Sequence, residues 1–394
     1  MKIDDYYIEV ASHQENKYGN QVCGDVFLSK KIKEESKTIT VLSDGLGSGI
    51  KANVLATMTA SMALNYSAIN EPIERTAKTI MNTLPLDAKR KINYSTFTIL
   101  NIDSDGESKI VEYDNPPFYL IRNGKIVKIP ACKIEIESNS KNKIVHEYHF
   151  FAQKEDRIVI VSDGVTQAGI GSVGMPFGWG DDAVGKYILA ILINEPNISA
   201  RALSKKVINK AQMLDALKIK DDASCAVIYF RAPRQLLICS GPPYHIESDE
   251  QFCKTIAQFN GKKIICGGTT AQIVSRELKI PIETTLFQMV SEIPPSSLMN
   301  GIDLVTEGIL TIGKVVEILE HELDLNDECY GPASDIVRLF LENDFIHFLI
   351  GTKVNNAHQD PTLPVELEIR RSVLKKMAAL LENKYLKQVD IKYI

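Results

Sequence analysis

Short acidic side chains recur at the ends of apolar segments in the first 230 residues. Asp44 and Asp163 each follow an apolar run and precede a glycine, and Asp25 follows a Cys-Gly pair. Asp221 and Asp222 precede another apolar run, ASCAVIYF. Acids at strand ends can converge on one edge of a sheet, where like charges raise one another's pKa or require a counter-ion. This pattern indicates a cation site.

The donor set suggests which cation and which chemistry. Carboxylate oxygens without Cys or His suit Mg²⁺ or Mn²⁺ rather than zinc. Two such ions can activate a bridging water and stabilise in-line attack on a phosphoryl group. The glycine after Asp44 allows close backbone approach, so the Gly45 carbonyl is a further candidate ligand. The alternative for each Asp-Gly pair taken singly is a plain turn, because this pair is common in turns.

The elements that must position these acids follow from hydrophobic periodicity. Strand-like runs and helical segments alternate in a way that predicts an α+β layered domain with a mostly antiparallel sheet. In the first helix an apolar stripe is formed by Val54, Met58, Met62 and Tyr66. The expected strands are 6–10, 22–28, 38–42, a meander of 95–102, 109–114 and 118–121, then 157–161 and 224–230, and the expected helices are 50–69, 73–83, 183–194 and 199–217.

In their order and spacing these motifs resemble the metal-dependent protein phosphatase (PPM, type-2C) family, in its bacterial SpoIIE/RsbU-like branch. The similarity covers about residues 1–230. The combined order of the motifs is specific, although each motif alone is weak. The matching segments are CGD at 23–25, SDGLGSG at 43–49, YSTFTILNID at 94–103, NPPFYLIRNGK at 115–125, RIVIVSDGV at 157–165 and DDAS at 221–224.

The resemblance implies a four-layer α-β-β-α sandwich and a role for each acid. Asp44 would bridge two Mn²⁺ or Mg²⁺ ions, and Asp25 with the Gly45 carbonyl would complete the shell of one. Asp163 and Asp221 would hold the other ion, with Asp222 as a neighbouring alternative. It also implies a metal-bound hydroxide that attacks phosphoserine or phosphothreonine directly. Asp44, Asp163 and Asp221 are therefore the expected catalytic acids.

Two features depart from the family's pattern or extend it. No arginine near the first motif is placed convincingly to clamp a phosphate, and Lys17 is only a loose candidate. The glycine-rich segment 169–180 holds the single tryptophan, Trp179. It is either a flap beside the site or a simple surface loop.

Beyond the short linker Ala232-Pro233-Arg234 the pattern changes to regular alternation of strand and helix. Such alternation predicts a smaller α/β domain with a mostly parallel sheet covered by helices. The first domain, the phosphatase-like part, is therefore expected at 1–231. The second, at 235–394, is an α/β domain whose role the sequence does not identify, and regulation is the hypothesis for it. The expected strands are 236–239, 263–266, 283–287, 302–305 and 346–350, and the expected helices are 249–259, 270–278, 308–322, 332–342 and 364–386.

A loop of the second domain has the composition of an anion cradle. Gly267, Gly268, Thr269 and Thr270 follow a predicted strand and enter a predicted helix. Backbone N–H groups at a helix start bind anions, so the hypothesis is a small anionic or phosphorylated ligand. Glu307 and His358, on neighbouring loops, are further candidates. The alternative is ordinary turn chemistry with a threonine as N-cap.

Composition limits the remaining possibilities. The net charge is −5, with 44% hydrophobic and 24% charged residues, which argues against nucleic acid or a membrane surface as partner. The N-terminus MKIDDYYIEV lacks the apolar core of a leader peptide, and no apolar stretch is long enough to span a bilayer. The seven cysteines form no CxxC pair, which favours buried thiols in a reducing compartment. We expect a cytoplasmic protein.

The leading functional hypothesis is a Mn²⁺- or Mg²⁺-dependent serine/threonine phosphoprotein phosphatase. By resemblance its substrate would be a phosphorylated bacterial regulator, such as an anti-sigma-factor antagonist. The second domain would gate activity or select the substrate. The competing hypothesis is a non-catalytic sensor or scaffold, in which the phosphatase fold binds partners and the second domain binds a small anion.

Overall fold

The computed structural model of the chain describes residues 6–32, 35–83, 95–137, 142–284, 294–321, 323, 331–352 and 363–394. It divides into two compact units, Met1–Ala232 and Pro233–Ile394. Within the described ranges no helix is both long and apolar enough to cross a membrane. Six described cysteines are free thiols, of which four are buried, and Cys329 lies outside the described residues.

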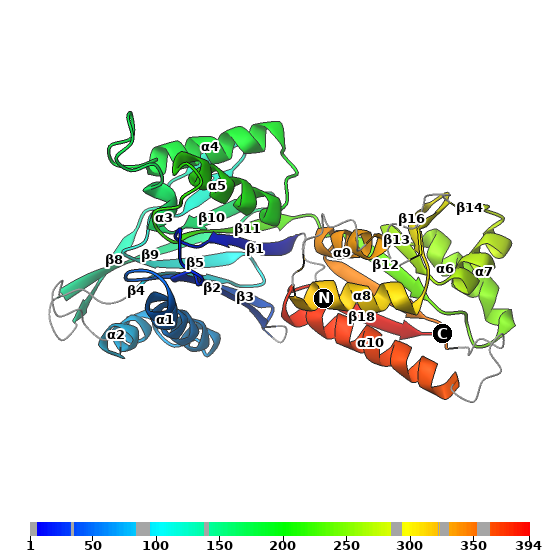
Figure 1. Cartoon of the computed structure of the whole chain (residues 1–394). Helices are drawn as coiled ribbons and strands as arrows, with labels where there is room; N and C mark the ends of the chain where they lie inside the picture. Colours follow the sequence, from blue (N-terminus) through cyan, green and yellow to red (C-terminus); the bar gives the residue numbers. More distant parts are fainter. Residues whose placement is uncertain are drawn as a thin grey trace. The chain divides into compact units, whose positions relative to one another are not determined.

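The first unit contains two antiparallel sheets (Figure 1). A five-stranded sheet has the order β1-β11-β10-β6-β7, formed by β1 (Tyr7–Glu15), β6 (Tyr119–Arg122), β7 (Lys125–Val127), β10 (Arg157–Val161) and β11 (Ala223–Arg231). A six-stranded sheet has the order β2-β3-β4-β5-β9-β8, formed by β2 (Asp25–Ile32), β3 (Lys37–Gly45), β4 (Ser95–Ile102), β5 (Glu107–Tyr113), β8 (Cys132–Glu137) and β9 (Asn142–Phe151). The helices are α1 (Ile50–Ala68), α2 (Ile73–Thr83), α3 (Asp163–Thr166), α4 (Asp181–Asn194) and α5 (Ala200–Leu214).

Alternation of side chains along the strands produces four layers. In β10, Val159 packs in the cluster that contains α4 and α5, whereas Ile158 packs between the two sheets. In β3, Val41 packs in the cluster that contains α1 and α2, whereas Leu42 faces the other sheet. Figure 1 shows the helix pairs on the outer faces of the two sheets. The expected α-β-β-α sandwich is confirmed.

The predicted meander is wrong at its third strand. β4 and β5 pair with each other, but β6 pairs with β10 in the other sheet. Pro116 and Pro117 separate β5 from β6, and proline has no N–H to continue a strand ladder. The partner of β5 is instead β9, which had no counterpart among the expected strands.

The apolar stripe expected on the first helix does not form its main buried face. Val54 and Met58 are 50% and 42% exposed, whereas the fully buried side chains of α1 include Ala56, Ala60 and Ala63. The reason is how closely the helix approaches the sheet. A Cβ at Gly45 would lie 2.2 Å from the carbonyl oxygen of Ala52, so only small side chains fit between α1 and β3.

The second unit is a seven-stranded sheet of order β14-β15-β16-β13-β12-β17-β18. β12, β13, β16, β17 and β18 are parallel and β14 and β15 are antiparallel, which confirms the expected mostly parallel sheet. Its strands are β12 (Gln235–Ser240), β13 (Lys262–Cys266), β14 (Ile282–Thr284), β15 (Ser297–Met299), β16 (Ile302–Thr306), β17 (Phe345–Ile350) and β18 (Gln388–Tyr393). Its helices are η1 (Ile246–Ser248), α6 (Asp249–Gln258), α7 (Gly268–Leu278), α8 (Ile309–His321), α9 (Pro332–Glu342) and α10 (Leu363–Asn383).

Candidate metal centre

Two of the predicted acids are direct cross-strand neighbours in one sheet. Asp25 is the first residue of β2 and lies opposite Asp44, near the end of β3. Cβ atoms of directly opposed residues lie about 4.5–5.5 Å apart, and like charges in such pairs are destabilising. A pair of carboxylates in this position therefore favours a bound cation.

The other predicted acids come from the second sheet of the sandwich. Asp163 begins α3 one residue after β10, and Asp221 and Asp222 directly precede β11. These two strands are neighbours, so their loops meet at one end of the sheet. The Ser224 N–H donates to the Ser162 hydroxyl at 2.9 Å, which holds the two loops together.

A serine joins the acids of the two sheets. The Ser224 hydroxyl, on β11, donates to Asp25 Oδ2, on β2, at 2.6 Å. The Gln14 side chain donates to the Ser224 hydroxyl at 2.9 Å and to the Asp25 carbonyl at 3.2 Å. Ser224 stands within the DDAS motif, which was the sequence signal for it. Gln14 lies in no motif, and only the register of β1 against β11 reveals it.

The glycines after two of the acids have a steric reason. A Cβ at Gly164 would lie 2.1 Å from the carbonyl oxygen of Asp222, just as one at Gly45 would meet the backbone of Ala52. Each Asp-Gly pair therefore marks a place where two backbones approach closely. The alternative of plain turns does not describe either position, because Asp44 and Gly45 end a strand and Asp163 and Gly164 begin a helix.

The electrostatics link the acids of both sheets. Burial raises the pKa of Asp44 well above its ordinary value, and the charges of Asp25, Asp163 and Asp221 raise it further. Burial also raises the pKa of Asp25, opposed by the Ser224 hydrogen bond and assisted by the charge of Asp222. Desolvation raises the pKa of Asp221, against the attraction of Lys17. The carboxylates thus repel one another in a buried place.

The residues present fit divalent cations with oxygen ligands. Asp25 Oδ1 and Asp222 Oδ2 are buried and accept no hydrogen bond among the described residues, so each has an oxygen available for an ion. As they lie in the described part of the chain, no three or more Asp, Glu, His or Cys side chains are close enough together to hold a metal ion. The acids are therefore neighbours whose oxygens a cation would have to draw together.

Lys17 and the glycine-rich segment lie at the border of the acids. The Lys17 N–H donates to Asp222 Oδ1 at 3.0 Å, and its ammonium lies 3.8 Å from Asp221 Oδ1, with both side chains more than two-fifths exposed. An ion pair this exposed contributes little stability. The 169–180 segment is tied at its start by the Gly169 N–H to Asp215 (2.8 Å) and at its end by the Gly180 N–H to the Thr166 carbonyl (2.8 Å). Whether it acts as a flap stays a prediction.

The candidate anion loop lies in the second unit. Gly267 follows β13, and Gly268, Thr269 and Thr270 form the first turn of α7, with Thr270 buried. Gly267 is the N-cap residue of α7, so neither threonine occupies the cap position that the alternative gave to a threonine. The Glu307 carboxylate comes within 3.6 Å of where a Gly268 side chain would be, and a carboxylate there repels anions. His358 lies outside the described residues, and the ligand hypothesis stays a prediction.

Comparison with protein families gives a match over the first unit. The family model for stage II sporulation protein E (SpoIIE) covers residues 34–231. The chain belongs to the SpoIIE family. This agrees with the resemblance drawn from the acidic motifs. No curated protein matches.

Solved structures similar to this member of the SpoIIE family have low sequence identity to it, and several are described as phosphatases. The phosphatase domain of SpoIIE from Bacillus subtilis is 18% identical, with 58% of this chain and 94% of that chain covered and a TM-score of 0.45. RsbX in complex with magnesium is 20% identical, with 58% and 98% covered and a TM-score of 0.40. The catalytic domain of PstP with two manganese ions is 13% identical, with 57% and 99% covered and a TM-score of 0.40.

Proposed function

We propose that residues 1–231 form a Mn²⁺- or Mg²⁺-dependent phosphatase that hydrolyses phosphoserine or phosphothreonine. The observation that carries this proposal is the position of Asp44. It lies directly opposite Asp25 in one sheet, and its charge is coupled to those of Asp163 and Asp221 from the other. Membership of the SpoIIE family, and solved relatives that carry magnesium or manganese, support the same assignment.

Each acid has a proposed role toward two ions. Asp44 would lie between them, and Asp25 with the Gly45 carbonyl would hold one. Asp163 and Asp221 would hold the other, because the Asp163 charge raises the pKa of Asp221 and the Asp221 charge raises the pKa of Asp44, whereas the Asp222 charge raises the pKa of Asp25 and Asp221. Two bound ions supply an activated water and stabilise charge on the phosphoryl group.

The surrounding residues of this chain orient those acids. Ser224 and Gln14 hold Asp25 by hydrogen bonds, and the Lys17 N–H holds one oxygen of Asp222. The other oxygen of Asp222 is left buried and without a hydrogen bond among the described residues. Gly45 and Gly164 bring the neighbouring backbones close enough for the acids to converge.

The proposed substrate is a phosphorylated regulatory protein of a bacterial partner-switching system, such as an anti-sigma-factor antagonist. Similar solved structures include RsbX, a protein with RsbU and RsbW domains, and a component of the stressosome. The proposed location is the cytoplasm. The second unit, 235–394, would gate activity or select the substrate, with a small anionic ligand at Gly267–Thr270 as the proposed signal.

The test is release of phosphate from p-nitrophenyl phosphate and from a phosphoserine peptide, with Mn²⁺ and with a chelator. We expect turnover only with metal, and loss of turnover by at least about 100-fold in Asp44→Asn. Asp105→Asn is the matched control, because Asp105 also precedes a glycine but lies in an exposed turn. Full activity of Asp44→Asn would refute the metal assignment. An inactive chain that still binds its partner would support the scaffold alternative.

A further inference from the structure

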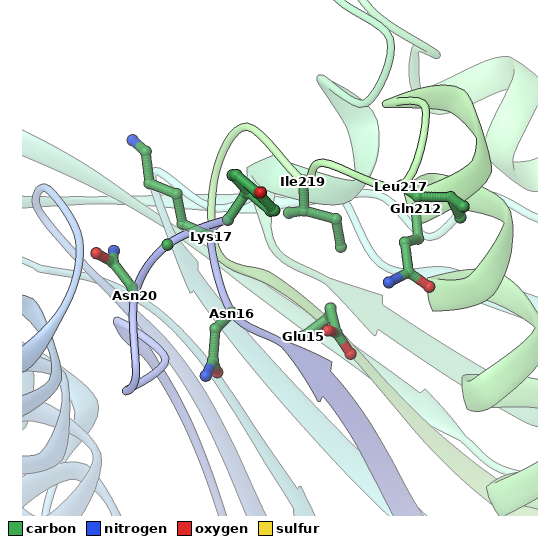
Figure 2. Close-up of a pocket in the computed structure, with 9 residues that line it drawn as sticks. Glu15, Asn16, Lys17, Asn20, Gln212, Leu217 and Ile219 are labelled. Atoms are coloured by element: carbon green, nitrogen blue, oxygen red, sulfur yellow. The ribbon is translucent and has the colours of Figure 1, made fainter.

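A hollow of about 180 Å³ lies beside the candidate metal centre in the first unit. It is formed by the loop that follows β1 and by the end of α5 with the turn after it (Figure 2). Its walls mix one acid, several amides and apolar side chains. The lining residues are Glu15, Asn16, Lys17, Tyr18, Gly19, Asn20, Gln212, Leu217 and Ile219.

The walls of this hollow are joined directly to the proposed metal ligands. The Tyr18 N–H donates to the Ile219 carbonyl at 2.8 Å, and Ile219 precedes Asp221 by two residues. The Lys17 N–H donates to Asp222 at 3.0 Å. A phosphoserine held at the acids would therefore place its neighbouring residues within reach of the hollow. An extended peptide advances about 3.3 Å per residue, so we expect the hollow to take a side chain within about three positions of the phosphoserine.

Glu15 and Lys17 are the two charged residues that line the hollow. The Glu15 carboxylate has no hydrogen bond or ion pair with any described side chain, whereas the other charged lining residue, Lys17, is paired with Asp221 at 3.8 Å. Figure 2 shows the Lys17 and Glu15 side chains pointing in different directions from the loop, and the Gln212 amide lines the same hollow as Glu15. A carboxylate without an ion-pair partner favours a cationic group.

The remaining walls suit a long side chain. Tyr18 and Leu217 are each 66% exposed, so both offer apolar surface to the stem of a long side chain, and the Lys218 ammonium lies 5.5 Å from the centre of the Tyr18 ring. Ala216 and Leu217 have positive φ angles of 53° and 64°, a conformation that is unfavourable for these residues and that clusters at functional sites. Asp215 anchors this turn by accepting the Lys220 N–H at 3.0 Å.

We propose that this hollow is a specificity subsite for the phosphoprotein substrate. It receives a lysine or arginine side chain two or three residues from the phosphorylated residue, with Glu15 as the counter-ion. Tyr18 and Leu217 contact the aliphatic stem. The proposal rests on the phosphatase activity proposed above.

The test uses the full chain with Mn²⁺ and a set of neutral phosphoserine peptides. One arginine is placed in turn at each position from three before to three after the phosphoserine, and kcat/KM is measured by phosphate release. We expect one position to raise kcat/KM by roughly 3- to 10-fold over the neutral peptide. This ratio should fall to about one in Glu15→Gln, and Glu15→Lys should prefer a glutamate at the same position. Tyr18→Ala provides a second variant that should reduce the ratio.

The matched control is Glu74→Gln, which removes an exposed acid from α2 and should keep the preference. Equal rates for all peptides, or an unchanged ratio in both Glu15→Gln and Tyr18→Ala, would overturn the subsite. The small ester p-nitrophenyl phosphate separates the two proposals, since it has no flanking residues. If the ester is hydrolysed and the peptides show no preference, only the subsite fails. If neither ester nor peptide is hydrolysed, both proposals fail.

Discussion

The hydroxyl of Ser224 donates a 2.6 Å hydrogen bond to the carboxylate of Asp25, and the two residues belong to different sheets. The second oxygen of Asp25 is buried and has no hydrogen-bond partner among the described residues. The bond therefore fixes which oxygen faces the other acids. It also fixes the spacing of the two sheets at the point where the acids meet.

Ser224→Ala should weaken metal binding. Residues that orient a metal ligand typically change metal affinity by about 10- to 100-fold when mutated. We expect the Mn²⁺ concentration for half-maximal activity to rise by about 10-fold, while the rate at saturating Mn²⁺ changes less. Ser12→Ala on β1 is the control and should leave the Mn²⁺ dependence as it is. An unaltered activation curve for Ser224→Ala would show that Asp25 needs no such support.

Asp44→Asn should change the response of stability to metal. In the presence of a chelator, removing one of several buried, mutually repelling carboxylates should raise the melting temperature. Mn²⁺ should stabilise the wild-type chain, because a ligand that binds only the folded state adds RT ln(1 + [L]/Kd). The variant should lose this shift. A thermal melt with and without Mn²⁺ measures both effects, and an equal Mn²⁺ shift in variant and wild type would contradict the assignment.

Gly164→Ala should destabilise the first unit. The added methyl would lie 2.1 Å from the Asp222 carbonyl oxygen, which is backbone and cannot rotate away. Overpacking of this kind costs about 1–3 kcal/mol in the free energy of unfolding. Urea unfolding followed by fluorescence measures it. Gly313→Ala in α8 is the control, since a Cβ there meets nothing within 4 Å and alanine favours helix by up to about 1 kcal/mol.

Glu112 should make stability depend on pH. Burial raises its pKa from 4.5 to about 7, against the hydrogen bonds from the Phe118 N–H and the Tyr148 hydroxyl. The folded chain therefore holds this proton more tightly than the unfolded chain does. The contribution of this proton to the free energy of unfolding is fully present below pH 4.5 and is lost as the pH rises through about 7.

Glu112→Gln cannot ionise and should be more stable than the wild-type chain above pH 7, by about 1–3 kcal/mol. The difference should shrink toward pH 5. Urea unfolding at pH 5.5 and pH 8 gives both values. Glu107→Gln, an exposed acid on the same strand, should show no such trend. A constant difference across the two pH values would mean that Glu112 is already ionised near pH 5.

Local patterns predicted a layered α+β domain and the strand-end positions of the acids, because strand runs and strand-end aspartates are properties of neighbouring residues, whereas the four-layer sandwich came from the family resemblance. What they missed depends on distant contacts. β6 joins the sheet opposite to the one expected, since two prolines release the chain between sheets. The buried face of α1 consists of small residues because Gly45 and Ala52 approach closely, and periodicity alone favoured the larger Val54 and Met58.

The candidate site, like the fold, could be predicted only in part from the sequence. Its acids are visible as motifs, whereas Gln14 enters it through the register of β1 against β11, and no local signal reports a register. The hollow around Glu15 had no signal either. Its walls are roughly 200 residues apart in the chain, and a backbone hydrogen bond between Tyr18 and Ile219 helps to join them.

The Ser224–Asp25 hydrogen bond also has a consequence for the order in which the site is assembled during translation of the chain. The two residues are separated by 199 positions, and Asp221 and Asp222 are encoded later than every other proposed ligand. A nascent chain that ends before Asp221 lacks two of the five acids and also β11, the strand that pairs with both β1 and β10. The centre is therefore completed by the last strand of the first unit to leave the ribosome, and truncated products of translation carry none of it in working form.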